Sequence, residues 1–118
     1  MRICHLTSAH PWTDTRIIEK QCRSLTAAGH EVFLVAVGEP PPGMEPVQAV
    51  SVPALTGGRA GRMSLQALRV WRAALSLGAD VYHFHDPELL PGALLARLTG
   101  RRVIYDVHEE VHLDIRTK

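Results

Sequence analysis

The sequence is short of cysteine, of net charge and of long apolar runs, and each shortage excludes a class of protein. Two cysteines in 118 residues are too few for a disulfide-stabilised scaffold. The apolar runs at residues 32–37 and 89–96 are far shorter than the ~20 residues of a membrane-spanning helix. Thirteen basic and twelve acidic side chains leave a net charge of +1, which argues against a dedicated binder of nucleic acid or of membrane surfaces.

The composition is otherwise that of an ordinary globular domain. Apolar residues make up 46% of the chain and charged residues 21%, and the length fits one domain with a modest core. Cys4 and Cys22 each sit in an apolar pattern, so both are expected to be small core residues. The segment Met1–His5 is strand-like and shows no signal-peptide pattern, which predicts a cytoplasmic location, with peripheral attachment to a membrane as the alternative.

Apolar runs typical of strands alternate along the chain with amphipathic repeats typical of helices. Strands are expected at residues 2–7, 32–37, 47–52, 81–84 and 103–107, and helices at 14–28, 64–77 and 88–98. This alternation predicts an α/β fold of the Rossmann-like, three-layer α/β/α type, with a mostly parallel sheet of about five strands in the order 3-2-1-4-5. The direction of the third strand stays open, because the connection through Pro40–Pro46 is near the lower limit for a parallel crossover.

Two of the remaining stretches carry further expectations. Residues 53–62 hold glycines and arginines and are expected to form a surface loop, with Ser64 as the N-cap of the next helix. A phosphate cradle at Gly57–Arg59 and Arg62 is the alternative interpretation of that loop. The helix at 88–98 is apolar almost all round, so it is expected to be buried on more than one side, by further chain or by a partner.

Titratable residues gather where three of the expected strands end. They are His10, Asp14 and Arg16 after the first strand, His83, His85 and Asp86 at the end of the fourth, and Asp106, His108 and Glu109 at the end of the fifth. The carboxyl ends of parallel strands meet at one edge of a sheet, and ligands bind where the strand order reverses, here between the first and fourth strands. A titratable cluster at this switch point is what an active site requires, so the site is expected there.

Each candidate also has a purely structural interpretation. His83 and His85 point to the same face of a strand, and each fits a hydrogen-bonded structural histidine. His85, at the strand tip, is the one expected to move a proton or to bond a sugar hydroxyl. Asp86 fits a helix N-cap before a proline, which leaves it free to orient His85 as well. Asp14 is expected either to cap a helix or, with Arg16, to meet an anionic ligand.

A metal site is a further interpretation of the histidines. Histidine and carboxylate suit zinc, and His83, His85 and His108 lie in expected reach of Asp86. Their spacing matches no metal-binding motif, and Asp86 fits a cap better, so no metal ligand is assigned. No glycine-rich dinucleotide motif follows the first strand, and the chain has no phosphate-binding lysine motif.

Four segments in register resemble one known family. The N-terminal blocks of the large retaining glycosyltransferase family four resemble four segments of this chain. These are residues 5–17 (HLTSAHPWTDTRI), 25–32 (LTAAGHEV), 80–91 (DVYHFHDPELLP) and 103–109 (VIYDVHE). Each block alone is weak, but the order and spacing match over nearly the whole chain, apart from residues 39–63.

The resemblance implies a GT-B enzyme, in which two Rossmann-like domains face each other across a cleft. Residues 1–118 would be the N-terminal, acceptor-side domain, without the C-terminal nucleotide-sugar domain, and therefore inactive alone. Such enzymes need no bound metal or other cofactor. The resemblance places His85 with Asp86 at the catalytic site. It places His10, Asp14 and Arg16 near acceptor and donor phosphates, and His108 and Glu109 at the rim of the acceptor pocket.

The expected partners are a nucleotide sugar and an acceptor of unknown type, whether saccharide, lipid-linked or small molecule, and not nucleic acid. Two other functions compete with sugar transfer. One is a non-catalytic docking module that uses the apolar helix 88–98, with self-association through that helix. The other is a metal hydrolase centred on His83, His85 and His108.

Overall fold

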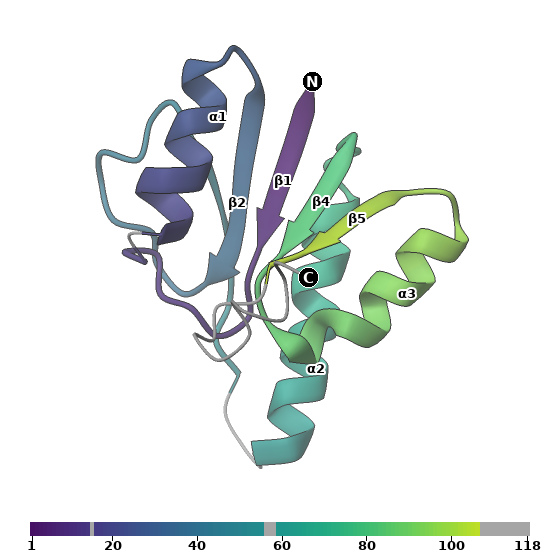
Figure 1. Ribbon diagram of the computed structural model, residues 1–118. Helices are drawn as coiled ribbons and strands as arrows, with labels where there is room; N and C mark the ends of the chain where they lie inside the picture. The colour runs from purple at the N-terminus through teal and green to yellow at the C-terminus, as the bar shows by residue number, and fades with distance from the viewer. Residues whose placement is uncertain (15, 56–58, 107–118) are drawn as a thin grey trace, which may run out of the picture.

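The computed structural model describes residues 1–14, 16–55 and 59–106. Within these residues, strands and helices alternate along the chain (Figure 1). The elements are β1 (Arg2–Leu6), η1 (Arg16–Cys22), α1 (Arg23–Ala27), β2 (Glu31–Val37), β3 (Gln48–Val52), α2 (Arg59–Leu75), β4 (Val81–Phe84), η2 (Pro87–Leu89), α3 (Leu90–Leu98) and β5 (Arg102–Tyr105).

The five strands form one sheet in the order β3-β2-β1-β4-β5, and every neighbouring pair is parallel. The predicted fold class and strand order are therefore confirmed. β3 runs parallel to β2 although only residues 38–47 connect them. Strand β1 lies in the centre, between β2 and β4, so the strand order reverses between β1 and β4. The expected switch point exists.

Helices cover both faces of the sheet and give the three predicted layers (Figure 1). On one face, η1 and α1 pack against β2, with a core that includes Ile17, Ile18, Cys22, Val32 and Leu34. On the other face lie α2, η2 and α3, with a larger core that includes Val70, Trp71, Ala74, Tyr82 and Phe84. The alternation of side chains along each strand explains the division, because successive residues point to opposite faces.

The helix boundaries differ from the predicted ones in two places. The helix predicted over 14–28 is a π-helix, η1, followed by the short α1. Its apolar pattern does not distinguish the two types, because both place residues four or five apart on one side. The loop predicted over 53–62 is wrong in its second half: α2 begins at Arg59, so Ser64 is not its N-cap. Alanine and arginine are good helix formers, and a single glycine costs only about 1 kcal/mol in a helix.

Helix α3 packs closely on α2 through a glycine. A Cβ atom at Gly92 would lie 2.4 Å from Cδ1 of Trp71, so no larger residue fits without moving the indole ring. The Trp71 Nε1 atom also donates a hydrogen bond of 2.8 Å to the Leu89 carbonyl. Within the described residues only one side of this helix is covered, so its burial on a second side, by further chain or by a partner, stays a prediction. Its outward residues Leu94, Leu95 and Leu98 are exposed.

Both cysteines are buried in the core, as predicted. Burial raises the pKa of Cys4 and of Cys22 to about 12, so both thiols stay protonated at neutral pH. Among the described helices, none has the length and apolar character needed to cross a bilayer.

Candidate functional site

The segments that follow β1 and β4 meet at the carboxyl edge of the sheet, and Asp86 joins them. Its carboxylate accepts hydrogen bonds from the Thr7 hydroxyl and, at 2.8 Å, from the Ser8 backbone N–H. His10 Nδ1 lies 2.7 Å from the other carboxylate oxygen. The Asp86 side chain is buried, so these bonds are shielded from water. A second link joins the same segments, because the Ser8 hydroxyl donates to Glu88 Oε2 at 2.7 Å.

The prediction that Asp86 caps the following helix is half right. Asp86 stands at the N-cap position of η2 with extended backbone, but its side chain makes no capping hydrogen bond. The carboxylate turns toward the β1 segment because three donors there converge on it. Asp14 does act as a cap, since its Oδ1 atom accepts a hydrogen bond of 3.1 Å from the Ile17 backbone N–H.

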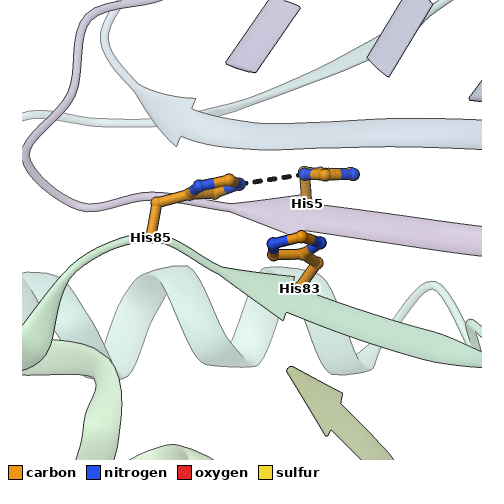
Figure 2. A group of neighbouring side chains, drawn as sticks. All are labelled: His5, His83 and His85. Atoms are coloured by element: carbon orange, nitrogen blue, oxygen red, sulfur yellow. Dashed lines mark hydrogen bonds between the residues drawn. The ribbon is translucent and has the colours of Figure 1, made fainter. Parts of the chain in front are cut away.

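Three histidines lie together on the face of the sheet that carries η1 (Figure 2). His5 of β1 pairs in register with His83 of β4, and the two rings stack with centroids 4.5 Å apart. The His83 and His85 rings also stack, 4.8 Å apart and only 9° from parallel, which confirms that they share a face. His5 Nδ1 and His85 Nε2 share a hydrogen bond of 2.9 Å, so one of the two nitrogens carries the proton.

The histidine cluster also contains the carboxylate of Asp106, the residue that directly follows β5. Asp106 Oδ2 lies 3.5 Å from His83 Nε2 and 3.9 Å from His85 Nδ1. The same oxygen accepts a hydrogen bond from the Gln21 side-chain amide of η1. The cluster is thus assembled from β1 and η1 near one end of the sequence and from β4 and the residues that directly follow β4 and β5 near the other.

Burial controls the protonation of His5. Removal from water, and to a lesser extent the neighbouring His83, lower the pKa of His5 to about 3, although Asp106 acts in the opposite direction. His5 is therefore neutral at physiological pH. Its Nε2 atom is buried and has no hydrogen-bond partner among the described residues.

The ring geometry of the three histidines does not suit a common metal ion. Their nitrogen atoms come within 4.8 Å of one another, close enough to be considered as ligands. A histidine binds zinc through a nitrogen lone pair that lies in the ring plane. Stacked, nearly parallel rings direct their lone pairs into separate planes, and the hydrogen bond between His5 and His85 occupies the two nitrogens that face each other. Chelation would require at least one ring to rotate.

A cleft of about 420 Å³ opens at the same edge, on the side of α2. Ser8, Gln66 and Glu88 give it polar groups, and Val37, Leu55 and Met63 contribute apolar wall. Both functional atoms of the Gln66 amide are already bonded to the chain, to Pro53 O and to Leu55 N. The Ser8–Glu88 pair is therefore the polar group best placed to meet a ligand in this cleft.

The predicted site residues divide into three groups. His10, His85 and Asp86 come together at the switch point, as the sequence indicated. The His85 side chain is fully buried and hydrogen-bonds His5, so it packs inside the fold at this edge of the sheet. Asp14 caps η1 and Arg16 begins it. His108 and Glu109 lie outside the described residues. Gly57 and Gly58 of the alternative phosphate cradle also lie outside them.

Sequence reasoning missed His5 as a member of the cluster. It placed Asp106 at the same edge by the rule that strand ends share an edge, but it gave this residue no role. His5 lies inside β1, and only the register between β1 and β4 places it opposite His83. That register is not encoded in any local pattern.

The likeness to solved structures extends over most of the chain, at low sequence identity. The glycosyltransferase SsfS6 of Streptomyces sp. SF2575, solved with thymidine diphosphate, superposes with a TM-score of 0.61 and 20% identity, covering 91% of this chain and 38% of its own. MurG of Acinetobacter baumannii gives 0.59 and 16%, covering 91% and 35%. A UDP-GlcNAc 2-epimerase of Methanocaldococcus jannaschii gives 0.54 and 16%, covering 89% and 31%.

These likenesses establish the fold, and the fold alone does not separate a transferase from an epimerase. The chain spans well under half the length of each of the three proteins. Among curated proteins no match was found. A family model, described as a glycosyl transferase 4-like domain, matches residues 15–117, which is most of the sequence. The chain therefore belongs to the glycosyl transferase 4-like domain family.

Proposed function

We propose that this chain is the acceptor-side domain of a GT-B glycosyltransferase that moves a sugar, of the hexose type, from a nucleotide sugar to an acceptor with retention of configuration. The observation that carries the proposal is the cleft beside the Ser8–Glu88 pair, at the switch point of a chain of the glycosyl transferase 4-like family. Ligands of open α/β sheets bind at such a point.

The cleft suits an acceptor with a hydroxyl group and an apolar portion. Glu88 already accepts from Ser8 at one carboxylate oxygen, and its carboxylate can accept a further hydrogen bond from an acceptor hydroxyl. Val37, Leu55 and Met63 can pack against the apolar portion. Asp86 contributes by holding the β1 and β4 segments together, which fixes the distance between Ser8 and Glu88.

The reaction joins the acceptor oxygen to the anomeric carbon of the sugar while the bond from that carbon to the diphosphate breaks. The nucleoside diphosphate leaves with the electron pair, and its departing oxygen takes up the proton that the acceptor hydroxyl loses. Groups that stabilise the departing diphosphate supply most of the rate in such a step. In the proposed enzyme these groups and the nucleotide site belong to a C-terminal domain beyond Lys118, and neither a metal ion nor another cofactor takes part. We place the reaction in the cytoplasm.

The buried position of His85 suggests how it acts. Its ring is held by His5 and lies near Asp106, below the edge of the sheet. We assign His85 a positioning role for the segment that carries Asp86 and Glu88, because its buried ring has no exposed surface with which to contact the transferred sugar. His10, beside Asp86, is the more accessible of the two histidines and faces the same edge.

The 118-residue chain alone is predicted to turn over no nucleotide sugar, because it contributes only the acceptor side of the cleft. The test is to incubate the purified chain with a panel of nucleotide sugars and measure release of nucleoside diphosphate. A coupled assay that detects one turnover per hour is sensitive enough, and a known glycosyltransferase serves as the positive control. Steady release above the rate without protein would contradict the assignment to one half of a site.

A further inference from the structure

The charged residues of this chain are segregated, although its net charge is only +1. None of the twelve acidic residues lies between residues 46 and 79 or between residues 89 and 105. These stretches contain α2 and α3, and their arginines are Arg59, Arg62, Arg69, Arg72, Arg97, Arg101 and Arg102. One layer of the fold therefore carries much of the positive charge without acidic residues in its two helices.

The same two helices expose leucines side by side. Leu65 and Leu68 of α2 are 47% and 56% exposed, and Arg69 follows directly on that outward side. Leu95 and Leu98 of α3 are 67% and 81% exposed. We call this surface the leucine–arginine face: Leu65, Leu68, Arg69, Arg72, Leu94, Leu95, Leu98 and Arg97.

One leucine from each helix borders the same groove. This largely apolar groove between α2 and α3 is lined by both Leu68 and Leu95 and by Trp71 and Gly92, and Glu88 is its one acidic lining residue. The close packing of Gly92 on Trp71 brings the helices together and sets this groove. In a helix, residues three and four apart share a face, so Leu65, Leu68, Arg69 and Arg72 form one stripe along α2.

The charge pattern separates the possible occupants of this face. A second copy of the chain would bring arginines against arginines, and such like-charge contact opposes association. Protein interfaces favour aromatic, methionine and arginine side chains, whereas the exposed apolar side chains of this face are all leucines and include no aromatic ring. Leucine inserts into the acyl boundary of a bilayer, and arginine reaches from there to lipid phosphates.

We infer that the leucine–arginine face docks on the surface of an anionic lipid bilayer, with α2 and α3 lying in the plane of the membrane. No described helix is long and apolar enough to span the bilayer, so the contact is peripheral. This inference does not depend on the proposed sugar transfer, because it rests on the exposure and charge of the two helices alone.

The test is co-sedimentation of the protein with vesicles of phosphatidylcholine, with and without phosphatidylglycerol. The protein is expected to sediment with the anionic vesicles only, and added salt should weaken the binding because salt screens surface charge. Failure to sediment with either vesicle would overturn the inference, and so would equal binding to both.

Paired variants locate the contact. Arg69→Gln with Arg72→Gln should lower the partition constant by about 25-fold, since each arginine near an anionic surface contributes about a factor of five. Leu95→Gln with Leu98→Gln should abolish measurable binding, and the circular dichroism spectrum should be unchanged because both side chains are exposed. Lys20→Gln, an exposed cation on the opposite face, is the matched control and should bind as the parent does.

Two outcomes would point to another occupant. Unchanged vesicle binding by both paired variants would show that a different surface meets the lipid and would overturn the inference. Sedimentation equilibrium measures self-association. If the parent self-associates but does not bind vesicles, and Leu95→Gln with Leu98→Gln abolishes the self-association, the face is assigned to a second copy instead.

Discussion

Mild acid is expected to destabilise this fold, and replacing His5 by asparagine should remove much of that effect. In the folded chain the pKa of His5 is lowered to about 3 by burial and by His83, against an ordinary value of 6.5. The unfolded chain therefore binds a proton on His5 at a pH where the folded chain does not. The stabilising contribution is complete above the ordinary pKa and is lost as the pH falls through 6.5 toward 3.

The expected loss is large compared with the stability of a small domain. It accumulates at about 1.4 kcal/mol per pH unit and reaches about 3 kcal/mol near pH 4. Domains of this size are stable by about 5–15 kcal/mol. The cost arises because the His5 ring is removed from water and stacks on His83, although Asp106 offsets part of it.

Urea unfolding between about pH 7 and pH 4 measures this dependence. His5→Asn keeps a polar atom that can bond His85 Nε2 but has no proton to gain, so its pH profile should be flatter than that of the parent. His30→Asn, at a half-buried histidine outside the cluster, should leave the slope as it is. Parallel profiles for the parent and His5→Asn would show that His5 does not control acid stability.

Asp86→Ala is expected to cost about 3 kcal/mol of folding stability. The substitution leaves the buried Thr7 hydroxyl and the Ser8 backbone N–H without their acceptor, and each such group costs about 1–3 kcal/mol. It also removes the contact to His10 and leaves space beside β1. The folding stability of Asp86→Asn should lie between that of the parent and that of Asp86→Ala. The amide keeps one acceptor oxygen, but its NH2 group faces groups that are themselves donors.

Asp80→Ala is the matched control for Asp86. Asp80 also accepts a backbone N–H from β1, that of Arg2 at 2.7 Å, but the site is exposed and water can replace the carboxylate. It should cost less than about 1 kcal/mol in the same chemical unfolding experiment. Equal losses for Asp80→Ala and Asp86→Ala would mean that the carboxyl-edge network adds nothing beyond a surface contact.

The fold was predictable because it depends on local patterns. The apolar run at 32–37, for instance, indicated a strand covered on both faces, and β2 occupies that place between β1 and β3. The site was predictable only to the level of the edge. Asp86 looked like a cap because the sequence before Pro87 is that of a cap, and the donors that divert its side chain come from residues far away in the chain.

The histidine cluster was also only partly predictable from the sequence. His83 and His85 could be placed on one face from their spacing, but their partners His5 and Asp106 depend on strand register and on a neighbouring strand end. The overall composition gave no sign of the leucine–arginine face. The net charge of +1 is a sum over the whole chain, so it does not report how the charges are distributed, and it argued against a membrane-surface binder.

The most direct test of the proposed function is the fate of the sugar when the product of the whole gene, read beyond Lys118, is incubated with nucleotide sugars and candidate acceptors. We expect the sugar to move to an acceptor with the same anomeric configuration, as nucleoside diphosphate is released in equal amount. Nuclear magnetic resonance of the product reports both points. A sugar that stays on the nucleotide with one carbon inverted, as an epimerase of the same fold would leave it, would contradict the account.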